Sequence, residues 1–193
     1  MDCTRQIVDL VARSERFAPH FHLPLQHGSD AALARMQRPY TLRYYRELIE
    51  YVLARIPHAS IGSDLIAGFP GETDAEFRQT TDYLSSSGLS HLHVFPYSDR
   101  PGTAATAMAG KVAGALVRER AATLRAIGTE LSRRFRQAQI GSVRPALTLD
   151  DGSVVVTDNY VKLRIGPGLS RNARVRVRVD GESSATVVQP RQA

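Results

Sequence analysis

The stretch Gly62-Ser63-Asp64-Leu65-Ile66-Ala67-Gly68-Phe69-Pro70-Gly71-Glu72-Thr73 decides the fold of this chain. Its first half has the apolar composition of a buried parallel strand, and its glycines and proline mark the turn that ends the strand. Thr73 then begins a capping-box pattern with Glu76, which predicts the start of a helix. The stretch therefore predicts a strand followed directly by a helix.

Two other blocks have the same order of residue types. They are His22-Leu23-Pro24-Leu25-Gln26-His27-Gly28-Ser29-Asp30 and His93-Val94-Phe95-Pro96-Tyr97-Ser98-Asp99-Arg100-Pro101-Gly102-Thr103. We therefore expect parallel strands at 21–25, 60–67 and 89–97. The spacing of apolar residues predicts helices at 4–16, at 41–56, from 73 to near 87, and from the end of the loop 98–114 to near 139. The predicted fold class is α/β.

The pattern changes near residue 140, where short β-rich runs replace the alternation of strands and helices. Runs at 143–149, 154–157, 160–165, 174–179 and 185–188 predict closely spaced strands, with a turn at Asp150-Asp151-Gly152. We therefore expect residues 1–139 to form a domain of βα units and residues 140–193 to form a second, all-β domain.

The net charge of +6 lies entirely in the second part of the chain. Residues 1–131 contain 14 Lys and Arg and 14 Asp and Glu, whereas residues 132–193 contain 11 basic and 5 acidic residues. A neutral part beside a basic part is typical of a small-molecule module joined to a module that faces nucleic acid. A basic surface that is only solvated explains the same charge, and composition alone leaves both interpretations open.

Composition excludes several classes of protein. With 42% hydrophobic and 23% charged residues the chain is typical of a soluble globular protein, and no apolar run approaches the ~20 residues that cross a bilayer. The N-terminus lacks a signal-peptide pattern, so we expect a cytoplasmic protein with no membrane partner. Cys3 is the only cysteine, which excludes an intrachain disulfide and a cysteine-held zinc or iron–sulfur site within this chain.

The ends of the predicted strands are expected to hold a binding site. The carboxyl ends of parallel strands lie at one edge of a sheet, so the loops that follow them converge. Gly28, Gly68 and Gly71 let the backbone approach a ligand, and the N–H groups after Gly71 are placed to receive a carboxylate. A tight turn capped by Thr73 explains the same residues. Residue types alone favour the turn, whereas the three blocks together favour the ligand site.

Histidines at 20, 22, 91 and 93 form two pairs, and the members of each pair share one face of a strand. Such pairs are often packed or hydrogen-bonded, and no acidic residue stands at ligand spacing, so we expect no metal site. Ser29 and Ser98 lack a Ser-His-Asp arrangement and a nucleophile-elbow motif. We therefore assign no catalytic residue.

In order, spacing and residue type, the three blocks resemble the later part of the radical S-adenosylmethionine (SAM) methylthiotransferases. Within that family the chain looks most like the MtaB type, whose members add a 2-methylthio group to threonylcarbamoyladenosine in tRNA. The resemblance covers residues 3–179 and implies the later half of a parallel βα barrel with SAM at its mouth. The residues that it places around SAM are Gln26, Gly28, Ser29, Asp64, Ile66, Gly68, Val94 and Phe95.

The chain also departs from that family. The family holds [4Fe–4S] clusters with a CxxxCxxC motif and further cysteines, and this chain has neither. The resemblance therefore implies an enzyme whose missing N-terminal portion supplies the cluster ligands, with Met1 internal to a longer reading frame, and this chain alone is expected not to cleave SAM. The missing strands should leave the sheet open and apolar surface exposed. His27 stands where the family usually has serine, and we interpret it as a partly exposed loop residue without a role.

The second part resembles a TRAM domain, a small β-barrel that holds tRNA in this family, most clearly at Asp158-Asn159-Tyr160-Val161-Lys162-Leu163. The arginines of the run 174–179 alternate and so project to one side, where they are expected to meet phosphates. Tyr160 is expected to stack on an unpaired base. The predicted RNA contacts are Tyr160, Lys162, Arg164, Arg174, Arg176 and Arg178.

Two other functions fit the same sequence. One is a non-catalytic RNA-binding protein in which the βα units are only a scaffold. The other is a ribosomal-protein methylthiotransferase, which has the same architecture. A cysteine motif upstream of Met1 would separate the first from an enzyme, and substrate assays would separate the second.

Overall fold

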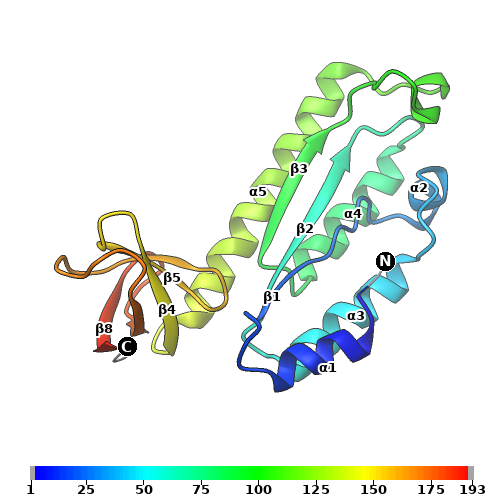
Figure 1. The fold of residues 1–193 in the computed structure, drawn as a ribbon. Coiled ribbons are helices and arrows are strands. Elements are labelled where there is room, and N and C mark those ends of the chain that lie inside the picture. The colour runs from blue at the N-terminus through cyan, green and yellow to red at the C-terminus, as the bar shows by residue number, and fades with distance from the viewer. Residues whose placement is uncertain (1–2, 191–193) are drawn as a thin grey trace.

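The computed structural model describes residues 3–190, which form two sheets joined by one long helix (Figure 1). The first sheet has three parallel strands in the order β1-β2-β3, which are β1 (His20–His22), β2 (Ser60–Ala67) and β3 (His91–Pro96). The second sheet has five antiparallel strands. The predicted α/β class and the predicted parallel pairing are confirmed.

The helices of residues 3–190 lie on one side of the first sheet, and the last of them leads into the second sheet. They are α1 (Arg5–Arg13), α2 (Asp30–Arg35), α3 (Leu42–Arg55), α4 (Asp74–Ser86) and α5 (Gly114–Gln139), with a short 3-10 helix, η1 (Ala104–Ala107), before α5. Helix α4 begins with the predicted capping box, in which Thr73 and Glu76 each accept the other's backbone N–H. The six residues of α2 are too few to show a helical period, so the sequence did not predict this helix.

Helices cover only one face of the first sheet. Phe21, Ile61 and Leu65 point to that face and are buried in one apolar cluster with Tyr45 of α3 and Leu84 of α4. In Figure 1, α5 runs beside β3 toward the second sheet. No helix or strand of residues 3–190 packs on the face of the three strands away from the helices, and this face is open except at His20, on which the Tyr160 ring lies.

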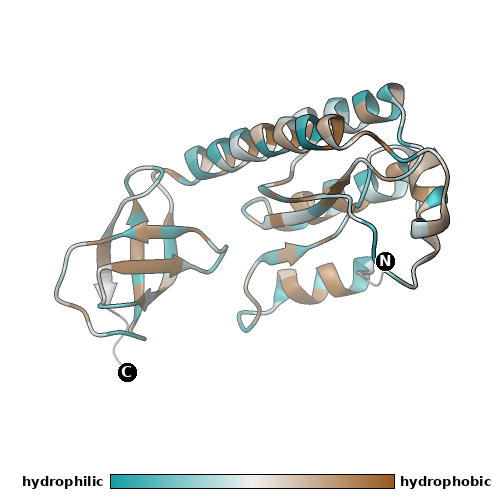
Figure 2. Ribbon diagram, turned by 90° about the horizontal axis from the view of Figure 1, so that it is seen from above, coloured by the Kyte–Doolittle hydropathy of each residue, from teal (hydrophilic) through white to brown (hydrophobic). Residues whose placement is uncertain are grey.

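The second sheet curls until its edges meet. Its strands are β4 (Val143–Leu149), β5 (Val154–Thr157), β6 (Lys162–Arg164), β7 (Arg174–Val179) and β8 (Ala185–Pro190), in the order β6-β5-β4-β7-β8. Arg164 on one edge bridges Ser184, beside the other edge, and its N–H donates to the Ser183 carbonyl at 2.8 Å. Alternate residues such as Val175 and Val177 point into a second apolar cluster, and hydrophobic and hydrophilic positions alternate along these strands (Figure 2).

A turn of the second sheet docks on the first part of the chain. The Asn159 amide is buried, and its Nδ2 donates to the His58 carbonyl at 2.9 Å and to Gln139 Oε1 at 2.8 Å. The neighbouring Tyr160 ring stacks on His20, with 4.5 Å between the ring centroids. The turn therefore contacts the turn after α3, the end of α5 and the start of β1. Within residues 3–190 no helix is long and apolar enough to cross a membrane.

Candidate functional site

The open face of the first sheet carries its polar side chains in successive cross-strand rows. One row consists of His22, Gly62 and His91, and the next row pairs Asp64 with His93. His22 Nε2 lies 3.1 Å from Asp64 Oδ1. The open face is thus more polar than the predicted apolar surface, because histidines and a carboxylate occupy its middle.

Histidine rings lie close enough on this face to affect one another's charge. Burial and the nearby rings of His20, His93 and His22 lower the pKa of His91 to about 4. Burial, followed by the neighbouring His22, also lowers the pKa of His20. His91 is therefore neutral at neutral pH.

A rim of mixed character follows at the carboxyl ends of the strands. Ile66 lies opposite Phe95, and the Phe95 side chain is 52% exposed. Gln26 lies beside this pair, because its N–H donates to the Asp64 carbonyl at 2.8 Å and its carbonyl accepts from Ile66 N at 2.9 Å. Val94 points to the other face, where it packs against the first apolar cluster. Val94 and Phe95 are both predicted to lie around SAM, but only Phe95 has its side chain on the open face.

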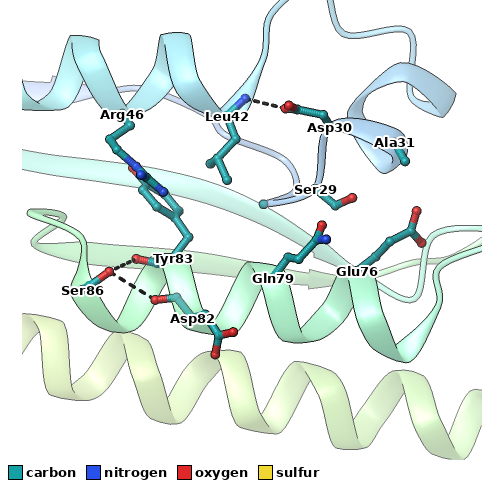
Figure 3. A pocket seen from close by; sticks show the side chains of 11 residues that line it. Ser29, Asp30, Ala31, Leu42, Arg46, Glu76, Gln79, Asp82, Tyr83 and Ser86 are labelled. Atoms are coloured by element: carbon teal, nitrogen blue, oxygen red, sulfur yellow. Dashed lines mark hydrogen bonds between the residues drawn. The ribbon is translucent and has the colours of Figure 1, made fainter.

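Gly28 and Ser29 are buried beside α4 rather than on the open face. The Gly28 N–H donates to Thr80 Oγ1 at 3.1 Å, and a Cβ at Gly28 would lie 2.6 Å from Thr80 Cα. Both residues line a groove of about 680 Å³ between α2, α3 and α4, together with Arg46 and Tyr83 (Figure 3). The structure therefore does not bring all the predicted SAM residues together, because Gly28 and Ser29 line this groove and Val94 points to the helix-covered face.

The turn after β2 satisfies its own N–H groups. The N–H groups of Gly68 and Thr73 donate at 2.8 Å to the carboxylates of Glu72 and Glu76, respectively, and Gly71 N donates at 2.8 Å to a carbonyl of the loop before α5. Groups of the chain itself therefore occupy these three N–H groups, and the prediction that N–H groups after Gly71 receive a ligand's carboxylate stays a prediction for the rest of the helix start. Gly68 has a φ of +79°, and a Cβ there would lie 2.4 Å from a side chain of α5. Gly68 is thus required by the turn.

His27 lies in the interior of the protein. Its side chain is 1% exposed, so the prediction of a partly exposed loop histidine is wrong. His27 Nδ1 accepts from Ser29 N at 3.0 Å, and His27 Nε2 lies 3.4 Å from Glu72 Oε2. Glu72 also accepts from Arg120 of α5, at 2.8 Å between Oε1 and Nη1. These contacts, which come from the next turn and from α5, bury the imidazole and tie together the loops that follow β1 and β2.

Glu72 is charged in spite of its burial. Burial opposes ionisation, but hydrogen bonds from His27 and the Gly68 N–H and the charge of Arg120 outweigh it. Of these, the hydrogen bond with His27 is the largest, and together with the Gly68 N–H and Arg120 it holds the pKa of Glu72 below its usual value. A buried carboxylate therefore anchors the turn between β2 and α4.

The predicted RNA contacts fall into two groups on the outer face of the second sheet. Arg174 and Arg176 line a groove of about 1050 Å³ between this sheet and the loop before β1, and Tyr160 lies in the same groove. Lys162 and Arg164 line a smaller groove of about 470 Å³ near the end of α5. The structure therefore brings together only part of the predicted set.

Arg178 and Tyr160 already have partners within the chain. Arg178 Nε lies 3.0 Å from Asp180 Oδ1, so a carboxylate faces this guanidinium. The Tyr160 ring is 63% exposed and rests on His20 with one face. Its other face remains available for stacking.

Sequence patterns missed three side chains of the larger groove. Arg16 and Phe17 come from the loop before β1, and Arg55 comes from the end of α3. Phe17 is 53% exposed, and an aromatic residue beside an arginine in a loop is the one local signal that could have indicated it.

Cys3 packs against the first apolar cluster, and burial raises the pKa of its thiol. The residues of this chain do not fit a [4Fe–4S] cluster, because Cys3 is the only thiol and such clusters are held by several cysteine thiolates.

Residues 1–84, which include β1, β2 and the turn after β2, match the family model of the Radical SAM superfamily. The chain is 34% identical over 160 residues to the threonylcarbamoyladenosine tRNA methylthiotransferase MtaB of Aquifex aeolicus, covering 83% of this chain and 39% of that protein. It is 33% identical over 168 residues to the protein of the same name from Bacillus subtilis, covering 83% and 37% of the two chains.

A second kind of relative matches a shorter part of the chain. The tRNA-2-methylthio-N(6)-dimethylallyladenosine synthase of Streptomyces viridosporus is 40% identical over 140 residues, which are 72% of this chain and 28% of that protein. The chain thus spans less than half the length of each of these relatives. Over that part, the predicted resemblance to the radical SAM tRNA methylthiotransferases, including those of the MtaB type, is confirmed.

Proposed function

We propose that this chain is the part of a radical SAM methylthiotransferase that lines SAM and holds tRNA, in a cytoplasmic enzyme that modifies threonylcarbamoyladenosine. The observation that carries the proposal is the open face of three parallel strands, which ends in the rim of Gln26, Ile66 and Phe95. The two relatives named for this nucleoside each match 83% of the chain. Residues 1–139 alone make up a smaller share of the chain, so the matched part must extend into the second sheet.

The rim has side chains that suit SAM. The exposed Phe95 ring offers a stacking surface for adenine. The Asp64 carboxylate, one row below, can accept hydrogen bonds from ribose hydroxyls. Gln26 adds an amide at the strand end, whereas Gly28 and Ser29 would act by holding the loop that carries Gln26. Gly68 and Val94 would contribute backbone at the same edge.

SAM and the cluster supply the radical chemistry in the whole enzyme. This chain contributes no set of cluster ligands, and so we propose that it does not cleave SAM by itself. A further, N-terminal portion of the same enzyme would supply the cysteines and cover the open face. The residues of this chain then bind and orient SAM.

For the second sheet we propose a TRAM-like domain that begins at residue 140, just after α5. Its larger groove, with Arg174, Arg176 and the free face of Tyr160, would contact the tRNA backbone and an unpaired base. Lys162 and Arg164 would contact phosphates from the smaller groove. Arg178 would contribute less, because Asp180 faces it.

The two other functions make different demands on the chain. A ribosomal-protein methylthiotransferase would bind SAM in the same way, but the relatives described above are named for tRNA nucleosides, which favours tRNA. A non-catalytic RNA-binding protein has no need of the SAM rim. Binding of SAM therefore separates the proposal from a simple scaffold.

Isothermal titration of the full chain with SAM tests the proposal. We expect Phe95→Ala to weaken binding at least about fivefold, because stacking of a base on an aromatic ring contributes about 1–3 kcal/mol. Phe17→Ala is the matched control, since the Phe17 and Phe95 side chains are 53% and 52% exposed. Absence of SAM binding by the folded chain, or equal binding by the parent and the Phe95 variant, would overturn the proposed SAM site.

A further inference from the structure

Three of the histidines on the open face converge on one point. His22, His91 and His93 each offer a ring nitrogen, and these nitrogens lie within 4.8 Å of one another. The residues come from β1 and β3, which lie on opposite sides of β2. They lie in the rows below the rim of Ile66 and Phe95, so the proposed SAM contacts do not account for them.

Gly62 makes this convergence possible. It lies between His22 and His91 in their cross-strand row, and a glycine leaves the space above β2 free. The His91 ring occupies that space, because a Cβ at Gly62 would lie 2.1 Å from His91 Nε2. Any other residue at 62 would push the ring away from its present position.

Polar partners hold two of the three rings from outside the cluster. Asp64 Oδ1 lies 3.1 Å from His22 Nε2, and Ser90 Oγ lies 3.2 Å from His91 Nδ1. Metal-binding histidines typically give one ring nitrogen to the metal and the other to such a partner. The Ser90 contact leaves His91 Nε2, the nitrogen above Gly62, free for an ion.

The distances and the exposure suit a metal ion. Nitrogens bound to one ion at about 2.0–2.1 Å in a tetrahedron are about 3.4 Å apart, so small side-chain rotations bring the three rings into position. His22 and His93 are exposed, so an ion can enter from solvent. Three imidazoles are the ligand set that zinc and its neighbours in the first transition row accept.

We propose that His22, His91 and His93 bind a divalent transition-metal ion of the zinc type, with a fourth coordination position on the side of the sheet away from the helices. Asp64 is a positioning residue that orients His22. The ligands of the site are imidazoles, whereas the [4Fe–4S] clusters that the resemblance implies are held by cysteine thiolates. The sequence favoured no metal site because neither strand has an acidic residue at ligand spacing, whereas the carboxylate comes from β2.

Zinc titration of the full chain, without an affinity tag and without iron or sulfide, tests this site. We expect the parent to bind one zinc ion per chain at micromolar zinc, in competition with a coloured chelator. His91→Ala and His93→Ala should abolish this binding. Asp64→Asn should weaken it about 10–100-fold, as expected for loss of an outer partner of a ligand.

Gly62→Ala is the sharpest variant, because it keeps all three histidines and displaces only the His91 ring. It should weaken zinc binding at least about tenfold while the circular dichroism spectrum stays that of the parent. Three controls should bind zinc like the parent: His58→Gln, which changes a histidine outside the cluster, Cys3→Ser, and Phe95→Ala from the SAM rim.

Two results would overturn the proposal. One is a parent chain that binds no stoichiometric zinc at these concentrations. The other is a folded His91→Ala or Gly62→Ala variant that binds zinc as the parent does. Neither result bears on SAM, since the SAM titration depends on Phe95 and is measured without zinc.

Discussion

Replacing Arg174 and Arg176 together by alanine should lower the salt dependence of tRNA binding. Each phosphate contact contributes about 0.9 to the slope of log K against log salt on a duplex and about 0.7 on a single strand. Both guanidinium groups line the larger groove of the second sheet, and the structure records no ion pair for either one within residues 3–190. The slope should therefore fall by up to about 1.8 on a stem or about 1.4 on a loop.

Fluorescence anisotropy with a labelled tRNA transcript at several salt concentrations measures this slope. Arg118→Ala with Arg125→Ala is the matched control, since it removes the same charge from exposed positions on α5, far along the chain from the groove. Adding Arg178→Ala to the groove variant should change the slope less than either of the other two replacements, because Asp180 already faces Arg178. An equal fall in slope for the groove and control variants would refute the assignment, because it would mean that net charge alone determines binding.

Three further predictions concern the packing that holds these surfaces. The hydrogen bond from Arg35 of α2 is the main cause that lowers the pKa of Glu76 to about 2. The stability that this pair adds is therefore present above pH ~4.5 and is lost as the pH falls toward 2. Glu76→Gln should cost about 2–3 kcal/mol at pH 7 and flatten that acid dependence, whereas Glu47→Gln on the exposed face of α3 should do neither in urea titrations. Arg120→Met should destabilise the chain by about 3–5 kcal/mol, because it leaves the Glu72 carboxylate buried without its cation. Adding Glu72→Gln should restore part of this loss of stability. A loss below about 1 kcal/mol for Arg120→Met would contradict this prediction. Asn159→Ala should cost about 1–3 kcal/mol, since it leaves buried groups of α5 and of the turn after α3 without partners, and an unchanged urea midpoint would speak against this docking contact.

Local chemistry made most of the elements predictable. The strand expected at 60–67 is β2 (Ser60–Ala67), because a proline stop and a glycine turn bound its apolar run. Helix α4 begins at the predicted capping box, and Thr41 and Thr4 cap α3 and α1 through their hydroxyl groups. Signals of this kind lie within a few residues of the element that they define, so one sequence is enough to find them.

The rest of the candidate site depends on contacts between distant residues. Nothing near His27 indicates that Glu72 and Arg120 will bury it. The convergence of His22 with His91 depends on the register of β1 and β3 against Gly62, which only the assembled sheet determines. The sequence does not show that the N–H groups after β2 have partners within the chain, because these partners are side chains and a carbonyl of the loop before α5.

Chemical-shift mapping of the isotope-labelled full chain during titration with SAM tests the central claim most directly. The proposed SAM site predicts that the largest amide shifts occur at the rim of the open face, at Gln26, Ile66 and Phe95. Shifts confined to the groove of Arg46 and Tyr83, or no shifts at saturating SAM, would contradict it.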